Sequence, residues 1–139
     1  MGSKHRNDGT ANEFARRIMT MSQKILITLF NNDVAPRFDL TTEVLISSIG
    51  EDGAADENKT IVLARESTED LCQLILNEEI NVVICGGIEE EFFEYLTWKR
   101  VKVLDSVMGP WERAFDRFRE GRLEAGAILF DRTERKSHV

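Results

Sequence analysis

The best candidates for binding chemistry in this chain are Cys85, Gly86 and Gly87, which stand between an apolar run and a charged one. A thiolate is a soft ligand that suits iron–sulfur centres and copper(I). Two successive glycines let the backbone turn sharply and let a ligand approach their amides. Because a cluster usually needs about four such ligands, we expect Cys85 to contribute only to a shared metal site. The alternative is that Cys85 is a small apolar core residue.

A second group of candidate residues lies in the polar segment 31–39. Arg37 can attract an anionic ligand, and the side-chain amides of Asn31 and Asn32 can donate hydrogen bonds to it. The alternative is structural: Arg37 and Asp39 form a local ion pair, and Phe38 between them fills the core.

Catalytic machinery is harder to assemble from these residues. The two histidines, His5 and His138, lie near opposite ends of the sequence, so a nucleophile has no obvious base. The apolar strand predicted at 24–30 has no carboxylate for a two-metal nuclease. Glu89, Glu90 and Glu91 follow the glycines and would repel a phosphate. We therefore expect a protein that binds and does not catalyse.

The first half of the chain predicts an antiparallel meander. Short apolar runs rich in branched residues predict strands at Lys24–Phe30, Thr42–Ile49 and Thr60–Ala64. The links between them are short, as neighbouring antiparallel strands require. The acidic segment Gly50–Asn58 is expected to be the most flexible loop of the domain.

The second half predicts helices alternating with strands. Ser67 and Asp70 resemble a capping box that begins a helix carrying Leu71, Leu74 and Ile75.

A buried strand at Asn81–Cys85 leads into a helix with Ile88, Phe92, Phe93 and Leu96 on one face. A strand at Val101–Leu104 leads into a helix with Pro110 in its first turn and an apolar stripe at Trp111, Ala114, Phe115 and Phe118. Ala127–Phe130 is a last short apolar segment, expected to pack against the sheet.

The resulting order, βββαβαβα, predicts an α/β fold with a five-stranded mixed sheet and helices on both faces. This order resembles the ribonuclease-H-like architecture. Ligands of open α/β sheets bind at the carboxyl ends of the strands. We therefore expect the site along a rim formed by residues 31–39, 85–88 and 105–110.

Length and composition limit the classes of protein. The chain has 139 residues, which suits one domain at 23–130, with a flexible N-terminal extension at 1–22 and a polar tail at 131–139. The net charge of −7 and the lack of a basic stripe argue against nucleic acid. No apolar run approaches the roughly 20 residues that span a bilayer. Cys72 and Cys85 are expected to be free thiols in a reducing cytoplasm.

Three segments taken together, 24–46, 81–96 and 101–124, resemble the dinitrogenase iron–molybdenum cofactor biosynthesis family. The resemblance implies a ribonuclease-H-like fold, no catalysis, and partners among nitrogenase or metal-cofactor assembly proteins. It also implies an anionic metal–sulfur ligand, such as the iron–molybdenum cofactor or an iron–sulfur precursor. Many members have His-Phe-Gly where this chain has Arg37-Phe38-Asp39, so an imidazole is missing here.

Two hypotheses follow. The first is a small cytoplasmic carrier, monomeric or homodimeric, that holds an anionic metal–sulfur precursor, with Cys85 as its metal ligand. Its cofactor-binding residues would be Asn31, Asn32, Arg37, Phe38, Cys85, Gly86 and Gly87. The second is a protein–protein interaction or regulatory module of the same fold that no longer binds cofactor. The missing imidazole and the acidic surface favour the second.

Overall fold

The computed structural model describes residues 22–130. The predicted polar tail, and all but the last residue of the predicted N-terminal extension, lie outside the described residues. Within residues 22–130, no helix combines the length and the apolar character that crossing a bilayer requires.

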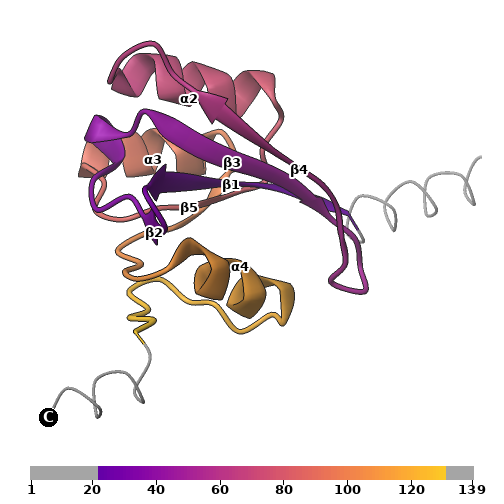
Figure 1. Ribbon diagram of the computed structural model, residues 1–139. Coiled ribbons are helices and arrows are strands. Elements are labelled where there is room, and N and C mark those ends of the chain that lie inside the picture. Colours follow the sequence, from indigo (N-terminus) through magenta and orange to yellow (C-terminus); the bar gives the residue numbers. More distant parts are fainter. Residues whose placement is uncertain (1–21, 131–139) are drawn as a thin grey trace, which may run out of the picture.

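The described chain is an α/β fold built on one mixed sheet (Figure 1). Strands β1 (Gln23–Phe30), β3 (Glu43–Ile49) and β4 (Ala55–Val62) pair antiparallel, which confirms the predicted meander. Strands β5 (Val82–Ile84) and β6 (Lys102–Leu104) are parallel to β1. The strand order is β4-β3-β1-β5-β6, so the longest strands lie on one side of the sheet and the shortest on the other.

The sheet has six strands, and the prediction of five was wrong. The additional strand is β2 (Asp33–Val34), which pairs with the end of β1 from within the predicted loop. Asn31 makes this possible because its φ of 57° reverses the chain within two residues. Asparagine tolerates this left-handed conformation better than most residues do. A short 3-10 helix, η1 (Phe38–Leu40), follows β2.

The predicted boundary of the third strand was also wrong. β4 begins at Ala55, so the second half of the expected flexible loop belongs to the sheet. Glu57 pairs with Ser48, and Asn58 pairs with Ser47. β4 lies at the edge of the sheet, where polar side chains remain in water, so pairing with β3 overrides their low strand propensity.

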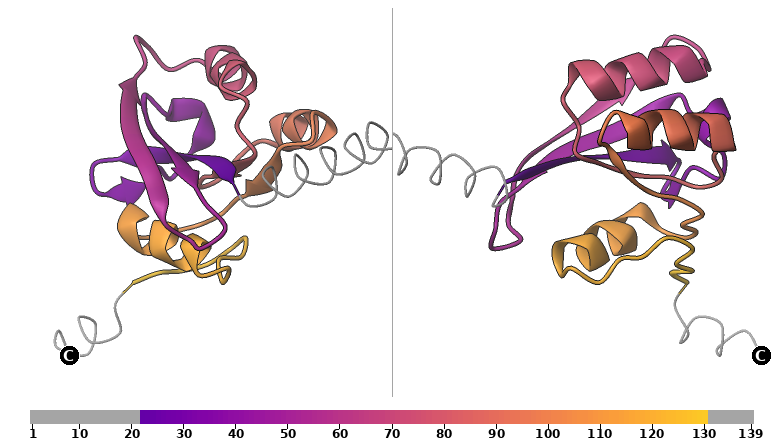
Figure 2. Two further views of the ribbon diagram at one scale, coloured as in Figure 1. Left: turned by 90° about the vertical axis from the view of Figure 1, so that its right-hand side faces the viewer. Right: turned by 180° about the vertical axis from the view of Figure 1, so that it is seen from behind.

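Helices cover both faces of the sheet, as predicted (Figures 1 and 2). Helices α2 (Thr68–Asn77) and α3 (Glu90–Trp98) lie on one face, and α4 (Trp111–Arg119) lies on the other. The Ser67 Oγ accepts a hydrogen bond of 3.2 Å from the Asp70 amide and caps α2, as the sequence predicts. Two boundaries differ from the predictions: Ile88 precedes α3, and Pro110 occupies the N-cap position of α4.

Alternating side chains of the central strands fill two separate cores. Ile25 and Ile27 of β1 pack with Ala114 and Phe115 on the α4 side. Leu26 packs with residues of α2 and α3 on the opposite side. β5 divides its side chains in the same way, since Val82 and Ile84 join the first core and Val83 joins the second. The prediction of a strand buried on both faces is confirmed.

Candidate functional site

The three predicted rim segments meet at the carboxyl ends of β1, β5 and β6. The Gly87 amide donates a hydrogen bond of 2.8 Å to the Pro36 carbonyl, and the Phe38 amide donates one of 2.8 Å to the Gly87 carbonyl. The Ser106 amide donates one of 2.9 Å to the Gly86 carbonyl. Backbone hydrogen bonds therefore hold all three segments along one edge of the sheet.

Gly86 is required because another backbone segment passes against it. A Cβ atom at this buried position would overlap the carbonyl oxygens of Ala35 and Pro36. At Gly87, which is exposed, the nearest atom to a Cβ would be the Pro36 oxygen at 3.6 Å, an ordinary contact. The first glycine of the pair thus allows the 35–38 backbone to approach β5 closely.

The expectation that both glycine amides serve a ligand was wrong for Gly87. Its amide is already bonded to the Pro36 carbonyl, because the 37–38 backbone pairs in parallel with the turn. This hydrogen bond joins two segments of the rim to each other, so the Gly87 amide is not free to donate to an anionic ligand.

Cys85 lies beneath the rim and does not project into it. Its side chain is 0% exposed and belongs to the core on the α2 and α3 side. Burial, with a smaller contribution from the charge of Asp105, raises the pKa of the Cys85 thiol to about 12. Among residues 22–130, no group of three or more His, Cys, Asp or Glu side chains is placed to hold a metal ion. A protonated, enclosed thiol does not suit the metal ligand expected from the sequence.

Arg37 and Phe38 follow the structural alternative. Phe38 is 1% exposed and packs in the same core as Cys85. The Arg37 guanidinium makes two hydrogen bonds to the Asp39 carboxylate, of 2.7 and 3.1 Å. This hydrogen-bonded pairing raises the pKa of Arg37 and lowers that of Asp39. The charge of Arg37 is therefore locally neutralised, although its side chain remains exposed.

Asn31 and Asn32 form the exposed turn between β1 and β2. The Asn32 carbonyl accepts a hydrogen bond of 3.0 Å from the Trp111 amide, which joins this turn to the start of α4. In the structure, Asn31 and Asn32 thus form the turn, and the Asn32 backbone attaches it to the first residue of α4.

A cleft of about 350 Å³ opens at the rim, and we call it the rim cleft. Within residues 22–130, Asp33 is the one charged residue in its lining. Three large apolar residues of the lining remain well exposed: Phe30 at 60%, Met108 at 52% and Phe130 at 47%. The described residues that line the cleft are Phe30, Asp33, Val34, Pro36, Gly86, Gly87, Ser106, Val107, Met108, Gly109 and Phe130.

Sequence reasoning located this cleft but missed its apolar lining. Phe30 ends β1, and its place at a strand's carboxyl end was the signal that it would reach the rim. Phe130 is the last residue of the predicted apolar segment Ala127–Phe130, which reaches the rim where Ile128 bridges to Met108. That pairing is long-range, and no local pattern predicts it.

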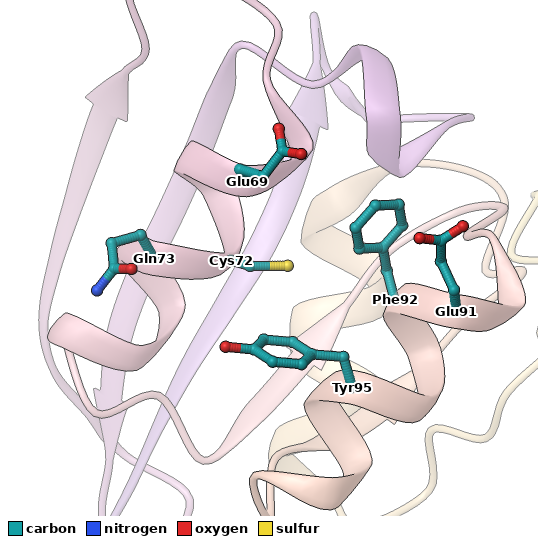
Figure 3. A pocket seen from close by; sticks show the side chains of 6 residues that line it. All are labelled: Glu69, Cys72, Gln73, Glu91, Phe92 and Tyr95. Atoms are coloured by element: carbon teal, nitrogen blue, oxygen red, sulfur yellow. The ribbon is translucent and has the colours of Figure 1, made fainter.

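A second hollow, of about 340 Å³, lies between α2 and α3 (Figure 3). Cys72 projects from α2 toward Phe92, and Tyr95 reaches across from α3. Cys72 is only 6% exposed, and burial, followed by the charge of Glu69, raises its pKa to about 11. Glu69 and Glu91 occupy the first turns of their helices, where the helix dipole favours a carboxylate. The hollow therefore holds a protonated thiol and provides no activated nucleophile.

No protein-family model and no curated protein matches the chain. Solved structures do resemble it. The crystal structure of PH0822 aligns with a TM-score of 0.67 at 19% identity, covering 74% of this chain and 94% of that one. A candidate dinitrogenase from Methanocaldococcus jannaschii aligns at 0.62 and 23% identity, covering 74% and 93%. A candidate NifB protein from Thermotoga, assigned to the DUF35 family, aligns at 0.56 and 20% identity, covering 79% and 98%. At these identities the likeness establishes a shared fold.

The close approach at Gly86 generates the first prediction. Gly86→Ala should lower the free energy of unfolding by about 1–3 kcal/mol, because the added methyl group meets backbone that cannot move aside. Gly87→Ala is the matched control and should change it by no more than about 0.5 kcal/mol. Urea denaturation measures both values. Equal stability of the two variants would show that the 35–38 backbone does not lie against Gly86.

The two thiols generate a pH prediction. Unfolded thiols ionise near their ordinary pKa of 9.0, whereas the folded ones remain protonated to about 11 and 12. The free energy of unfolding should therefore fall as pH rises from about 9 toward 12. The Cys72→Ala/Cys85→Ala double variant should show a shallower fall, whatever its stability at neutral pH. Denaturation at several alkaline pH values measures the two slopes, and parallel slopes would contradict the burial of the thiols.

Proposed function

We propose that this chain is a non-catalytic binding module with the fold of nitrogenase-related proteins, and that its rim cleft engages a partner protein. The observation that carries this proposal is the lining of the rim cleft. Phe30, Met108 and Phe130 leave large apolar side chains in water around a concave surface. Ile128, 64% exposed, lies beside Met108 and extends the same apolar surface. Apolar side chains gathered at one place on a soluble domain mark interaction sites.

The charge of the cleft indicates the kind of partner. Among the lining residues that the structure describes, Asp33 alone is charged, and the whole chain carries a net charge of −7. A partner that inserts an apolar side chain with a basic residue next to it would satisfy both features. An anionic partner surface would be repelled by the same carboxylate.

The state of the thiols supports a non-catalytic role. A thiol nucleophile acts as its thiolate and needs a lowered pKa. Burial raises the pKa of both Cys72 and Cys85 instead. Neither residue is prepared to attack a substrate at neutral pH.

The names of the similar structures support a cellular context. Two of them are described as a candidate dinitrogenase and a candidate NifB protein. We propose accordingly that the partner belongs to nitrogenase or metal-cofactor assembly and that the chain acts in the cytoplasm. We also assign the sheet to the ribonuclease-H-like class, an assignment supported by the order β4-β3-β1-β5-β6.

A second candidate function is the carrier of an anionic metal–sulfur precursor. The exposed thioether of Met108 favours it, because a soft sulfur at the rim could contact such a cargo. Its electrostatics are poor, since Asp33 faces the cleft and Arg37 is engaged by Asp39. Anaerobic incubation with an iron–sulfur precursor separates the two functions. Retained iron with a visible absorption band, lost in Met108→Ala, would favour the carrier.

The partner hypothesis predicts a specific loss of binding. Immobilised wild-type chain should retain a stoichiometric partner from an extract of its host, and Met108→Glu should retain at least tenfold less because a carboxylate in the cleft cannot be buried. Trp98→Glu is the control, since Trp98 is 76% exposed and lies on α3, outside the cleft lining. Mass spectrometry identifies the retained protein. Equal loss in both variants, or no partner at all, would contradict the proposal.

A further inference from the structure

β4 presents a long edge with which no other strand of residues 22–130 pairs. It spans eight residues, Ala55–Val62, and stands at the end of the strand order, with β3 as its one strand neighbour among the described residues. Figure 2 shows β4 along the outer border of the sheet, with the helices lying over the faces. An edge strand of this length offers a row of backbone donors and acceptors to another strand.

The register with β3 identifies the residues whose backbone points outward. The Leu63 amide donates a hydrogen bond of 2.7 Å to the Thr42 carbonyl, so the backbone of Leu63 faces β3. In an antiparallel strand this direction alternates from residue to residue. The backbone groups of Asn58 and Thr60 therefore face away from the sheet, and no strand in the described part of the chain pairs with them.

Two opposite charges flank Asn58 on one face of the strand. Glu57 and Lys59 are both exposed and line the same small hollow, of about 80 Å³. Lys59 Nζ lies 3.3 Å from the Glu78 carboxylate. The Glu78 carboxylate also forms an ion pair with Lys24, at 3.0 Å. Glu78 would therefore still have a cationic partner if Lys59 turned toward a carboxylate of another copy.

Two β4 strands from two copies of the chain can pair antiparallel in several registers. Among the registers centred on residues 57 to 60, only one brings opposite charges face to face. With Asn58 opposite the Asn58 of a second copy, each Glu57 faces a Lys59, and two-fold symmetry makes the pair twice. If Lys59 lies on the two-fold axis instead, two lysines face each other across the contact. If Glu57 lies on the axis, two glutamates face each other. With Thr60 opposite Thr60, Lys59 faces Ile61 and gains no charge partner.

We propose that two copies of this chain associate edge to edge through antiparallel β4 strands, with Asn58 on the two-fold axis. The contact joins two sheets into one continuous sheet. Glu57 and Lys59 set its register, since charges on an edge strand discourage every pairing in which like charges meet. The interface is a strand edge with little apolar area, so the dimer is expected to be weak. This proposal is independent of the rim cleft, which lies at the opposite side of β1 from β4.

Sedimentation equilibrium of the full chain tests the dimer. In low salt the apparent mass should rise from 15.9 kDa toward about twice that value as protein increases from roughly 0.01 to 1 mM. A wild-type chain that stays monomeric at the highest concentration overturns the proposal, including the case in which another segment of the chain covers the edge.

Charge exchange tests the register. Glu57→Lys and Lys59→Glu should each weaken the dimer at least tenfold, and the double exchange should restore it because opposite charges again face each other. Glu69→Lys makes the same change on α2 and should leave association unaltered. Thr60→Pro removes an outward amide without touching the bonds to β3, and it should also give a monomer. A dimer that persists in Glu57→Lys, or that the double exchange fails to restore, contradicts this register.

Discussion

The close approach of the 35–38 backbone to Gly86 is the contact on which the rim depends. It allows the Pro36 carbonyl to accept the Gly87 amide and the Gly87 carbonyl to accept the Phe38 amide. These bonds accompany the burial of Phe38 in the same core as Cys85, while Arg37 pairs with Asp39 at the surface. The absence of a side chain at Gly86 thereby allows the backbone arrangement in which Arg37 and Phe38 take their observed directions.

The same contact changes what the rim can bind. Sequence features that suggest an anion site, namely a thiol, two glycine amides and a guanidinium, are largely used by the protein itself. The thiol is buried, the Gly87 amide is bonded and the guanidinium is paired. In the described part of the chain, the surface that remains is apolar with one carboxylate, Asp33, and for this reason we propose a protein partner in place of an anionic cluster.

Local patterns in the sequence predict much of this fold and little of its site. The meander, the cap at Ser67 and the strand buried on both faces follow from periodicity and turn chemistry, which act over a few residues. β2 and the first half of β4 were missed because polar residues there are held in strands by pairing with distant segments. The segments of the rim were predicted correctly, whereas the directions of Cys85, Arg37 and Phe38 depend on packing across the edge.

Amide hydrogen exchange at Gly87 and Phe38 tests the central claim most directly, because it reports whether the 35–38 backbone is bonded to the glycine turn in solution. If the rim is closed by its own backbone, both amides should exchange as slowly as those of the central strand β1. Exchange at Gly87 as fast as in the exposed turn at Asn31 would mean that the amide is free, and it would contradict the account.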